Sequence, residues 1–334
     1  MPGHGAFIID IRRRAAAPSG MRRIAIGPVR PVPSWQWVGE GTAAALGADH
    51  AVATFADYGR PPPADLLLLV KQRPPDGFVG AAQAAGTRVI FLPIDLYESA
   101  GALLADAPFL AACDLVLSHS EALLPLLRPH CRRLGFVEHH GRDVLPEPAA
   151  WHEAGYVLWI GGLQHLPHLL RWLERTRLPA PLRLLTDLDN PVARAAAAAV
   201  ARRLEVELDI AMDAVNGHAA FAWAPERQRA MMTECRAAID IKGDDFAQRT
   251  KPPTKGQQLV ASGIPFACDP GGATAAHFRA RGFAVADPAD PARWFSQAYW
   301  GETARFAARL RPHLSPEAVG AVYRHWIERL LGPG

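Results

Sequence analysis

Short apolar runs alternate with helix-like segments along the first 140 residues. The run LLLLV at 66–70 is uninterrupted, which is typical of a strand buried on both faces of a parallel sheet. Repeated strand–helix–strand order favours a doubly wound α/β sheet. The strands that we expect here are residues 24–27, 52–55, 66–70, 89–92, 115–117 and 134–137, with helices over 42–46, 77–85 and 121–127.

A second series of the same kind begins at residue 156, after residues 141–154 lose the periodic pattern and carry Pro146 and Pro148. We therefore expect 141–154 to be a linker between two Rossmann-like domains. The domains that we expect are a loosely ordered arm at 1–20, an N-terminal domain at 21–145, a C-terminal domain at 155–314 and a final helix within 315–334. The strands expected in the second series are 156–160, 182–185, 206–210, 238–241, 264–267 and 282–286.

Composition excludes several classes of protein. The 334 residues include 36 Lys and Arg against 33 Asp and Glu, so the chain lacks the dense positive charge of a nucleic-acid binder. Four widely spaced cysteines form no CxxC pair, which argues for reduced thiols and against a zinc site. The longest apolar run is far too short to span a bilayer, and no signal-peptide pattern opens the chain. We expect a cytoplasmic protein with at most peripheral membrane contact, through Arg12, Arg13 and Arg14.

The stretch 237–269 has the pattern strand, polar loop, helix, strand. Thr254 followed by Gln257 fits a capping box, and Gly263 stands where a C′ glycine would end the helix. Arg249, Lys251 and Lys255 add three cations within seven residues beside this helix start. Free backbone N–H groups and the helix dipole make such a place suitable for an anion. The alternative is a solvated loop whose charges are balanced by neighbouring aspartates.

The residues DIKGDDFAQRTKPPTKGQQLVASGIPFA resemble the donor-binding unit in the C-terminal domain of GT-B glycosyltransferases. Weaker similarities to the same architecture lie in ACDLVLSHSEALLPLL, FLPIDLYES and residues 221–241. The resemblance implies two Rossmann-like doubly wound domains facing across a cleft, with the final helix crossing back to the first domain. One difference is that alignment on Gly263 and Pro265 places Thr250 and Gln258 where the best-known retaining enzymes carry two glutamates.

The resemblance also implies a donor site in the C-terminal domain. Trp223 is the candidate to lie near a nucleobase, although a tryptophan is more often part of a core. Paired glycines let a backbone approach a phosphate, but any tight strand-to-helix turn uses them. We expect no metal and no cofactor apart from the nucleotide-diphosphate sugar. The residues expected to contact this donor are Gly161, Gly162, Trp223, Lys242, Arg249, Thr250, Lys251, Thr254 and Lys255.

Side chains at the strand ends of the N-terminal domain are candidates for the base that takes a proton from an acceptor. Asp95 is preferred because partial burial raises the pKa of a carboxylate. His119 is the second candidate because the ordinary pKa of histidine is near neutrality, although a buried structural histidine is the commoner case. Glu98 and the cluster 138–140 remain open.

The expected activity is transfer of a sugar, a hexose or related unit, from a nucleotide-diphosphate sugar to an acceptor in the N-terminal domain. The acceptor is a glycan, a lipid-linked molecule or a small molecule. One alternative is a nucleotide-sugar 2-epimerase of the same fold, which needs acid and base groups in place of an acceptor pocket. Another is a nucleotide-sugar-binding protein that has lost its chemistry, which the missing glutamates favour.

Overall fold

The computed structural model describes residues 21–32 and 34–332, so the predicted arm at 1–20 lies outside the described residues. Contacts divide the chain into two compact units. Unit 1 holds the described residues up to His140, the short segment Thr250–Pro252 and the residues from His313 onward. Unit 2 holds Gly141–Arg249 and Pro253–Pro312.

Unit 1 is built on a six-stranded sheet of order β2-β1-β3-β4-β5-β6 in which every neighbouring pair is parallel. Central strand β3 is at most 3% exposed along its whole length, as its unbroken apolar sequence predicts. The strands are β1 (Arg23–Gly27), β2 (Ala51–Thr54), β3 (Leu66–Val70), β4 (Arg88–Leu92), β5 (Leu115–Ser118) and β6 (Leu134–Phe136).

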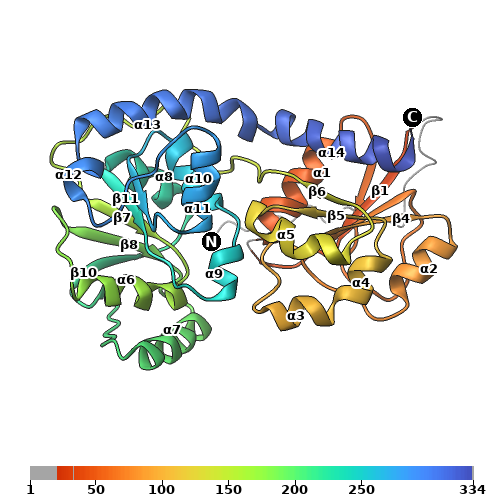
Figure 1. Ribbon diagram of the computed structural model, residues 1–334, viewed down its shortest axis with the longest axis horizontal. Coiled ribbons are helices and arrows are strands. Elements are labelled where there is room, and N and C mark those ends of the chain that lie inside the picture. Colours follow the sequence, from red (N-terminus) through yellow and green to blue (C-terminus); the bar gives the residue numbers. More distant parts are fainter. Residues whose placement is uncertain (1–20, 33, 333–334) are drawn as a thin grey trace, which may run out of the picture. The chain divides into compact units, whose positions relative to one another are not determined.

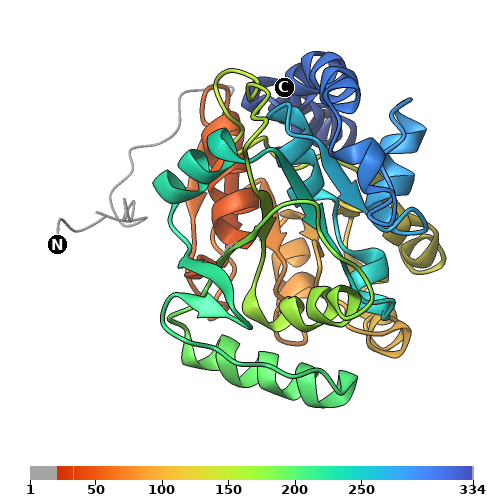
Figure 2. The ribbon, with the colours of Figure 1, turned by 90° about the vertical axis from the view of Figure 1, so that its left-hand side faces the viewer.

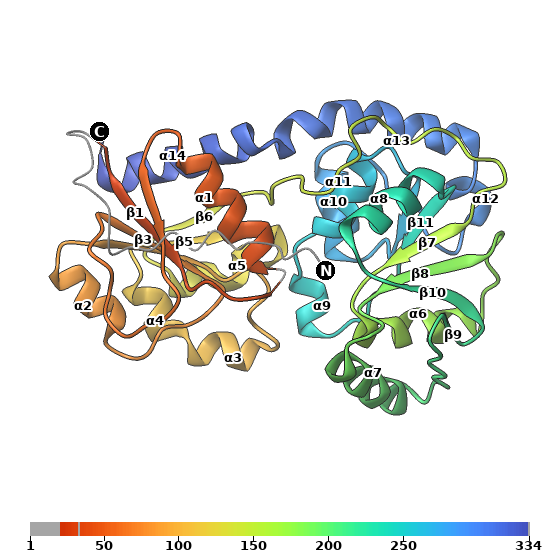
Figure 3. The same cartoon turned by 180° about the vertical axis from the view of Figure 1, so that it is seen from behind.

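Helices cover both faces of this sheet, with α1 and α14 on one face and α2, α3 and α4 on the other (Figures 1 and 3). The last helix belongs to the core of unit 1, because Val319, Tyr323 and Ile327 are buried against the sheet. Ser315 caps it by accepting a hydrogen bond from the Ala318 N–H, as predicted. The helices are η2 (Trp35–Glu40, a π-helix), α1 (Gly41–Leu46), α2 (Phe78–Ala84), α3 (Ala100–Ala105), α4 (Ala107–Ala112), η3 (Glu121–Leu123), α5 (Leu124–Leu127), η4 (Arg128–His130) and α14 (Pro316–Leu331).

Unit 2 is built on a second six-stranded sheet, of order β12-β11-β7-β8-β10-β9. All neighbouring pairs are parallel except β9 with β10. Two mostly parallel sheets with interleaved helices confirm the predicted α/β class. The strands are β7 (Val157–Ile160), β8 (Leu182–Thr186), β9 (Ala214–Val215), β10 (His218–Ala222), β11 (Ala237–Asp240) and β12 (Phe266–Cys268).

The helices of unit 2 also lie on both faces of their sheet, and Figure 2 shows α7 outermost on the face that α6 covers. The 3₁₀ turn η6 (Arg311–Leu314) joins α13 to α14. The remaining helices are η5 (Leu163–His165), α6 (Leu166–Leu173), α7 (Pro191–Leu204), α8 (Pro225–Glu234), α9 (Phe246–Thr250), α10 (Thr254–Ala261), α11 (Ala273–Ala280), α12 (Pro291–Trp294) and α13 (Gln297–Leu310).

The expected strand at 206–210 is wrong, since only Ile210 forms a single bridge, to Val215. The pairing comes instead from a hairpin of β9 and β10 that the apolar pattern did not predict. Its two turn residues, Asn216 (φ 49°) and Gly217 (φ 75°), are both left-handed, as a tight hairpin turn requires. The Asn-Gly pair was therefore a stronger signal than the apolar residues before it.

Two further predictions need correction. The expected strand at 282–286 is reduced to one parallel bridge between Ala267 and Ala286. Thr254 is the first helical residue of α10 and the N-cap is Pro253, so the predicted capping box is wrong. Proline is tolerated at the start of a helix because the backbone N–H that it lacks would have no hydrogen-bond acceptor within the helix there.

The end of α10 is as predicted. Gly263 adopts φ +73° and donates its N–H to the carbonyl of Val260 (2.9 Å), while Ile264 donates to the carbonyl of Leu259 (3.1 Å). These two bonds are the Schellman pattern, which satisfies the last carbonyls of the helix. They turn the chain sharply into β12.

The stretch expected as a linker, 141–154, is bonded to unit 2. The Ala149 N–H donates to the carbonyl of Ser262 (2.8 Å), and the Leu145 N–H donates to the Ser262 hydroxyl (3.0 Å). Within the described ranges, no helix is both long enough and apolar enough to cross a membrane.

Candidate functional site

Asp240 is the last residue of β11 and lies at the edge of the unit 2 sheet where the parallel strands end, here called the carboxyl edge. Its side chain is 2% exposed. The ammonium of Lys255 is 2.8 Å from Oδ1, and that of Lys242 is 3.3 Å from Oδ2. Burial acts to raise the pKa of Asp240, but the two ammonium groups outweigh it and hold the pKa well below its usual range. The cluster therefore carries one negative and two positive charges.

Lys255 is fixed on two sides. Besides Asp240, its ammonium lies 5.2 Å from the ring centroid of Trp159, a fully buried residue of β7. Burial lowers the pKa of Lys255, while Asp240 acts to raise it. The indole N–H of Trp159 donates no hydrogen bond to any of the described residues. Lys255 is therefore held between a carboxylate and an aromatic face.

The predicted glycine pair follows β7 directly. A Cβ on Gly161 would lie 2.8 Å from the Trp159 ring and 3.1 Å from the Lys255 ammonium, so only glycine leaves room for both. The Gly161 N–H already donates to the carbonyl of Leu185 (3.1 Å). The atoms nearest to a Cβ on Gly162 would be those of the flexible Gln164 side chain. Close packing thus explains Gly161, and its contact with a phosphate stays a prediction.

Lys242 links Asp240 to the start of the helix that follows β12. Its ammonium donates to the Thr274 hydroxyl (3.3 Å), in the first turn of α11, and its side chain is 19% exposed. That helix starts after Gly271 and Gly272 and has no side-chain cap at its N-cap residue. This turn was not predicted, although its signal, a Gly-Gly pair between a strand and a helix, is present in the sequence. Lys242 and the α11 N-terminus therefore place positive potential side by side.

Trp223 directly follows β10 at the same edge. Its backbone N–H donates to the carbonyl of Thr186 (2.7 Å), and its indole N–H donates to the buried side chain of Gln228 (2.6 Å). The residue is nevertheless 42% exposed. Trp223 is thus a fixed aromatic ring with an open surface, and is not a core residue.

The cations expected before α10 are not all part of this cluster. Arg249 is exposed on α9, whose start is fixed by the Asp245 carboxylate accepting from the Gln248 N–H (2.9 Å). Thr250 and Lys251 belong to the short segment that is grouped with unit 1. The structure thus gathers Gly161, Lys242 and Lys255 around Asp240, with Thr254 next to Lys255 in the chain.

In unit 1, Asp95 forms an ion pair with Lys71 (2.8 Å) whose side chains are 29% and 33% exposed. Burial acts to raise the pKa of Asp95, but Lys71 outweighs it and the pKa is lowered. The expectation of a raised pKa is therefore wrong. Lys71 (φ 60°) and Ile94 (φ 56°), which precedes Asp95, both have left-handed backbone, a strained state for a β-branched residue such as Ile94.

His119 is 2% exposed and its Nε2 lies 3.0 Å from the hydroxyl of Tyr323 in α14. Its ring centroid is 4.6 Å from that of His139, and His140 stacks on Tyr323 at 6.5 Å. Burial lowers the pKa of His119 well below its usual value, and lowers those of His139 and His140 to about 4. The three histidines, here called the histidine cluster, are therefore neutral at pH 7.

The histidine cluster is not a metal site. Throughout the part of the chain that the structure describes, no group of three or more His, Cys, Asp or Glu side chains has the arrangement needed to hold a metal ion. The role of His119 as an acid or base in catalysis stays a prediction.

Comparison with known proteins gives matches in structure alone. No protein-family model and no curated protein matches the sequence. AviGT4, a glycosyltransferase involved in avilamycin A biosynthesis, is 14% identical over 93% of this chain and 98% of its own, with a TM-score of 0.55. Anabaena Alr3699/HepE, solved in complex with UDP-glucose, is 11% identical over 92% of this chain and 100% of its own, with a TM-score of 0.63. The predicted fold is thereby confirmed, because the chain has the GT-B glycosyltransferase fold.

Proposed function

We propose that the protein is a glycosyltransferase whose nucleotide-diphosphate sugar binds at the carboxyl edge of unit 2. The observation that carries this proposal is the excess positive charge around Asp240, where Lys242 and Lys255 converge beside the α11 N-terminus. In open parallel sheets, ligands bind beyond the strand ends. A diphosphate is the ligand whose charge matches two cations and an uncapped helix start.

In this proposal the two lysines have different tasks. Lys242 contacts the diphosphate, because its ammonium is partly exposed and lies next to Thr274. Asp240 and Lys255 hold Lys242 in position, since Lys255 is already bound between Asp240 and Trp159. When the sugar leaves, negative charge grows on the terminal phosphate, and fixed cations stabilise that charge without a metal ion.

The nucleotide to test first is uridine diphosphate. HepE, which has the same fold, was solved with UDP, with UDP and glucose, and with UDP-glucose. The exposed ring of Trp223 supplies an aromatic surface for a base at the same edge as Lys242. The glucose and UDP-glucose bound by HepE support a hexosyl donor in this proposal.

The acceptor is assigned to unit 1, with Asp95 as the base. A carboxylate whose pKa is lowered is ionised at neutral pH and can accept a proton from a hydroxyl group. Left-handed backbone at Lys71 and at Ile94, the residue before Asp95, supports a functional role for the Asp95–Lys71 pair, because such strain concentrates at active sites.

A second candidate function is nucleotide-sugar binding without transfer. Gln258 stands where the retaining enzymes that the sequence resembles carry a glutamate, and its amide donates to the carbonyl of Arg142 (3.2 Å). A side chain used in this way cannot act as a carboxylate. This observation also favours inverting over retaining chemistry if the protein is an enzyme.

The test is a thermal-shift screen with UDP and UDP-glucose, followed by NMR of UDP-glucose incubated with the protein. A ligand at a hundred times its Kd adds about 2.7 kcal/mol of stability. We expect stabilisation by both nucleotides and slow release of glucose and UDP. Binding without turnover would favour the non-catalytic protein, and a 2-epimer would favour the epimerase. If neither UDP nor another nucleoside diphosphate stabilises the protein, the proposed function is wrong.

A further inference from the structure

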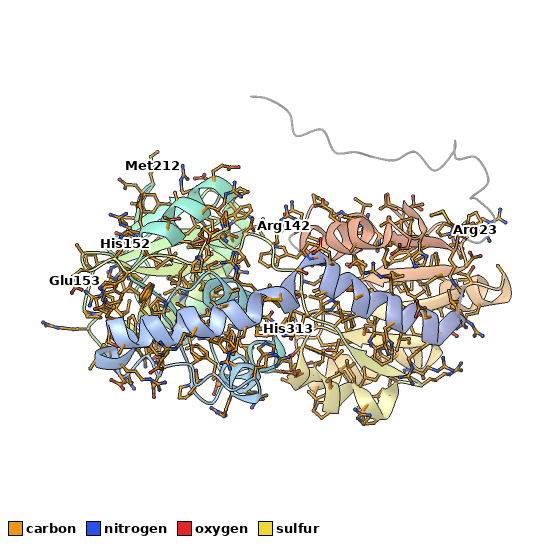
Figure 4. The ribbon with its side chains drawn as sticks, turned by 90° about the horizontal axis from the view of Figure 1, so that it is seen from above. Arg23, Arg142, His152, Glu153, Met212 and His313 are labelled. Carbon is orange, nitrogen blue, oxygen red and sulfur yellow. The ribbon has the colours of Figure 1, made fainter. Side chains whose placement is uncertain are left out.

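Unit 2 has a cavity of about 370 Å³ that does not belong to the carboxyl edge. Tyr156 immediately precedes β7, Arg183 is the second residue of β8, and Glu234 ends α8 just before β11. The cavity therefore lies toward the edge where these strands begin, whereas Asp240 lies where they end. Figure 4 labels two of its residues, His152 and Glu153. The complete lining is Trp151, His152, Glu153, Ala154, Gly155, Tyr156, Arg183 and Glu234.

Two aromatic side chains of the lining are held rigidly. Tyr156 is 6% exposed, donates its hydroxyl to the carbonyl of Met231 (2.9 Å) and carries the Arg183 guanidinium 4.0 Å from its ring centroid. Trp151 carries the guanidinium of Arg236 4.5 Å from its ring and donates its indole N–H to Glu153 (2.9 Å). Such preorganised groups lose little freedom when a ligand binds.

The charges of this cavity are balanced. Glu153 pairs with Arg236 (3.2 Å), and Glu234 lies 3.9 Å from Arg183. An anion would meet the carboxylates of Glu153 and Glu234. A cation would meet the guanidinium of Arg183, and the Glu153 carboxylate is already paired with Arg236, which lies outside the lining. The lining thus disfavours a net charge of either sign and favours a neutral ligand with many hydroxyl groups.

We propose that this cavity binds a neutral saccharide of one or two units. Sugar hydroxyls would donate to Glu153 and Glu234 and accept from Arg183, while Trp151 offers apolar surface to the C–H groups of a sugar ring. The volume is at the lower end of the range of about 300–1,000 Å³ for small-molecule sites. If the proposed transferase function also holds, the site would keep a glycan acceptor or product attached outside the site of transfer. The binding itself does not depend on that function.

The experiment is an NMR titration of the full chain with maltose, cellobiose, lactose and sucrose, observed at the indole N–H resonance of Trp151. The variant Trp151→Phe identifies this resonance. We expect at least one disaccharide to shift it at millimolar concentration, with the same Kd in the presence and absence of UDP. If no disaccharide shifts the resonance, or if UDP competes with the sugar, the proposal is wrong.

Matched arginine variants locate the sugar. Arg183→Met removes the guanidinium in the cavity but keeps an apolar stem, and we expect at least a fivefold weaker Kd for the disaccharide. Arg171→Met is the control, because Arg171 lies on α6 outside the cavity with a side chain 42% exposed, against 41% for Arg183. Equal affinities of the two variants would place the sugar elsewhere and overturn the assignment.

Discussion

Buried polar groups at the carboxyl ends of the strands differ in charge between the two sheets. In unit 1, the histidine cluster is buried beyond β5 and β6 and is uncharged, because burial lowers the pKa of each ring. In unit 2, Asp240 at the end of β11 is equally buried but ionised, because two lysines reach it. Burial thus outweighs the nearby carboxylates at His139 and His140 and removes their charge, whereas two close ammonium groups preserve the charge of Asp240. The strand ends of unit 1 therefore hold a neutral histidine cluster, and those of unit 2 hold an ionised carboxylate between two lysines.

The largest effect that we expect is the pH dependence from the histidine cluster. The pKa values of His139 and His140 in the folded chain are about 4, below the ordinary value of 6.5, so the unfolded chain binds more protons between these values. Stability should therefore be full above pH 6.5 and fall as the pH drops toward 4. Each ring contributes up to about 3 kcal/mol, at about 1.4 kcal/mol per pKa unit.

Urea unfolding at several pH values measures this loss. Asp240 does not contribute in that window, because its lowered pKa removes stability only as the pH falls below its ordinary value of 3.8. The double variant His139→Asn/His140→Asn should be less stable at pH 7 but show a flatter pH profile. An unchanged slope in this variant would assign the pH dependence to other groups.

The next effect is the loss of the buried carboxylate. Asp240→Asn leaves two ammonium groups without their counter-ion, which costs about 3 kcal/mol, at the low end for a broken buried pair because both lysines reach water. Asp95→Asn is the matched control in unit 1, since its ion pair with Lys71 is about one-third exposed and is worth about 1 kcal/mol or less. Urea unfolding at pH 7 compares them, and equal losses would contradict the difference that we draw between the two edges.

A smaller loss of stability is expected for alanine at two left-handed glycines, and the two sites distinguish backbone strain from steric packing. Gly86 in unit 1 (φ +82°) and Gly263 in unit 2 (φ +73°) are both left-handed, but only at Gly263 would a Cβ meet a neighbour, Pro148 at 3.0 Å. Gly86→Ala should cost about 1 kcal/mol, and Gly263→Ala somewhat more. Thermal unfolding of both variants checks the order, and a smaller loss at Gly263 would mean that Pro148 moves aside freely.

The fold could be predicted from the sequence wherever the local sequence pattern agreed with the tertiary packing. The run 66–70 became a fully buried strand, and Gly263 ended its helix in the expected left-handed conformation. The prediction was wrong at 206–210, where apolar composition was weighed above the turn formed by Asn216 and Gly217. A strand needs a partner, and short apolar segments do not show whether one is within reach.

The candidate site could be predicted only in part. The sequence predicted that Lys242 and Lys255 contact the donor, but it gave Asp240 only as one of the charges that balance a solvated loop. Asp240 is instead the buried centre of the cluster. The Lys255 ammonium that pairs with Asp240 also lies against Trp159 of β7 and close to Gly161, and contacts between distant segments leave no mark in the local pattern. For the same reason, the lowered pKa of Asp95 could not be expected without knowing that Lys71 lies beside it.

The most direct test of the charged edge is a calorimetric titration of UDP into the wild-type protein, Lys242→Ala and Lys71→Ala. Each variant removes one lysine that pairs with a carboxylate at a strand end, one in unit 2 and one in unit 1. A charge-assisted contact to phosphate is worth about 1.5–3 kcal/mol, so Lys242→Ala should raise the Kd for UDP by about ten- to a hundredfold. Lys71→Ala should leave that Kd within about twofold, since no phosphate contact is lost. A Kd for UDP that is unchanged in Lys242→Ala, or raised equally in both variants, would contradict the account.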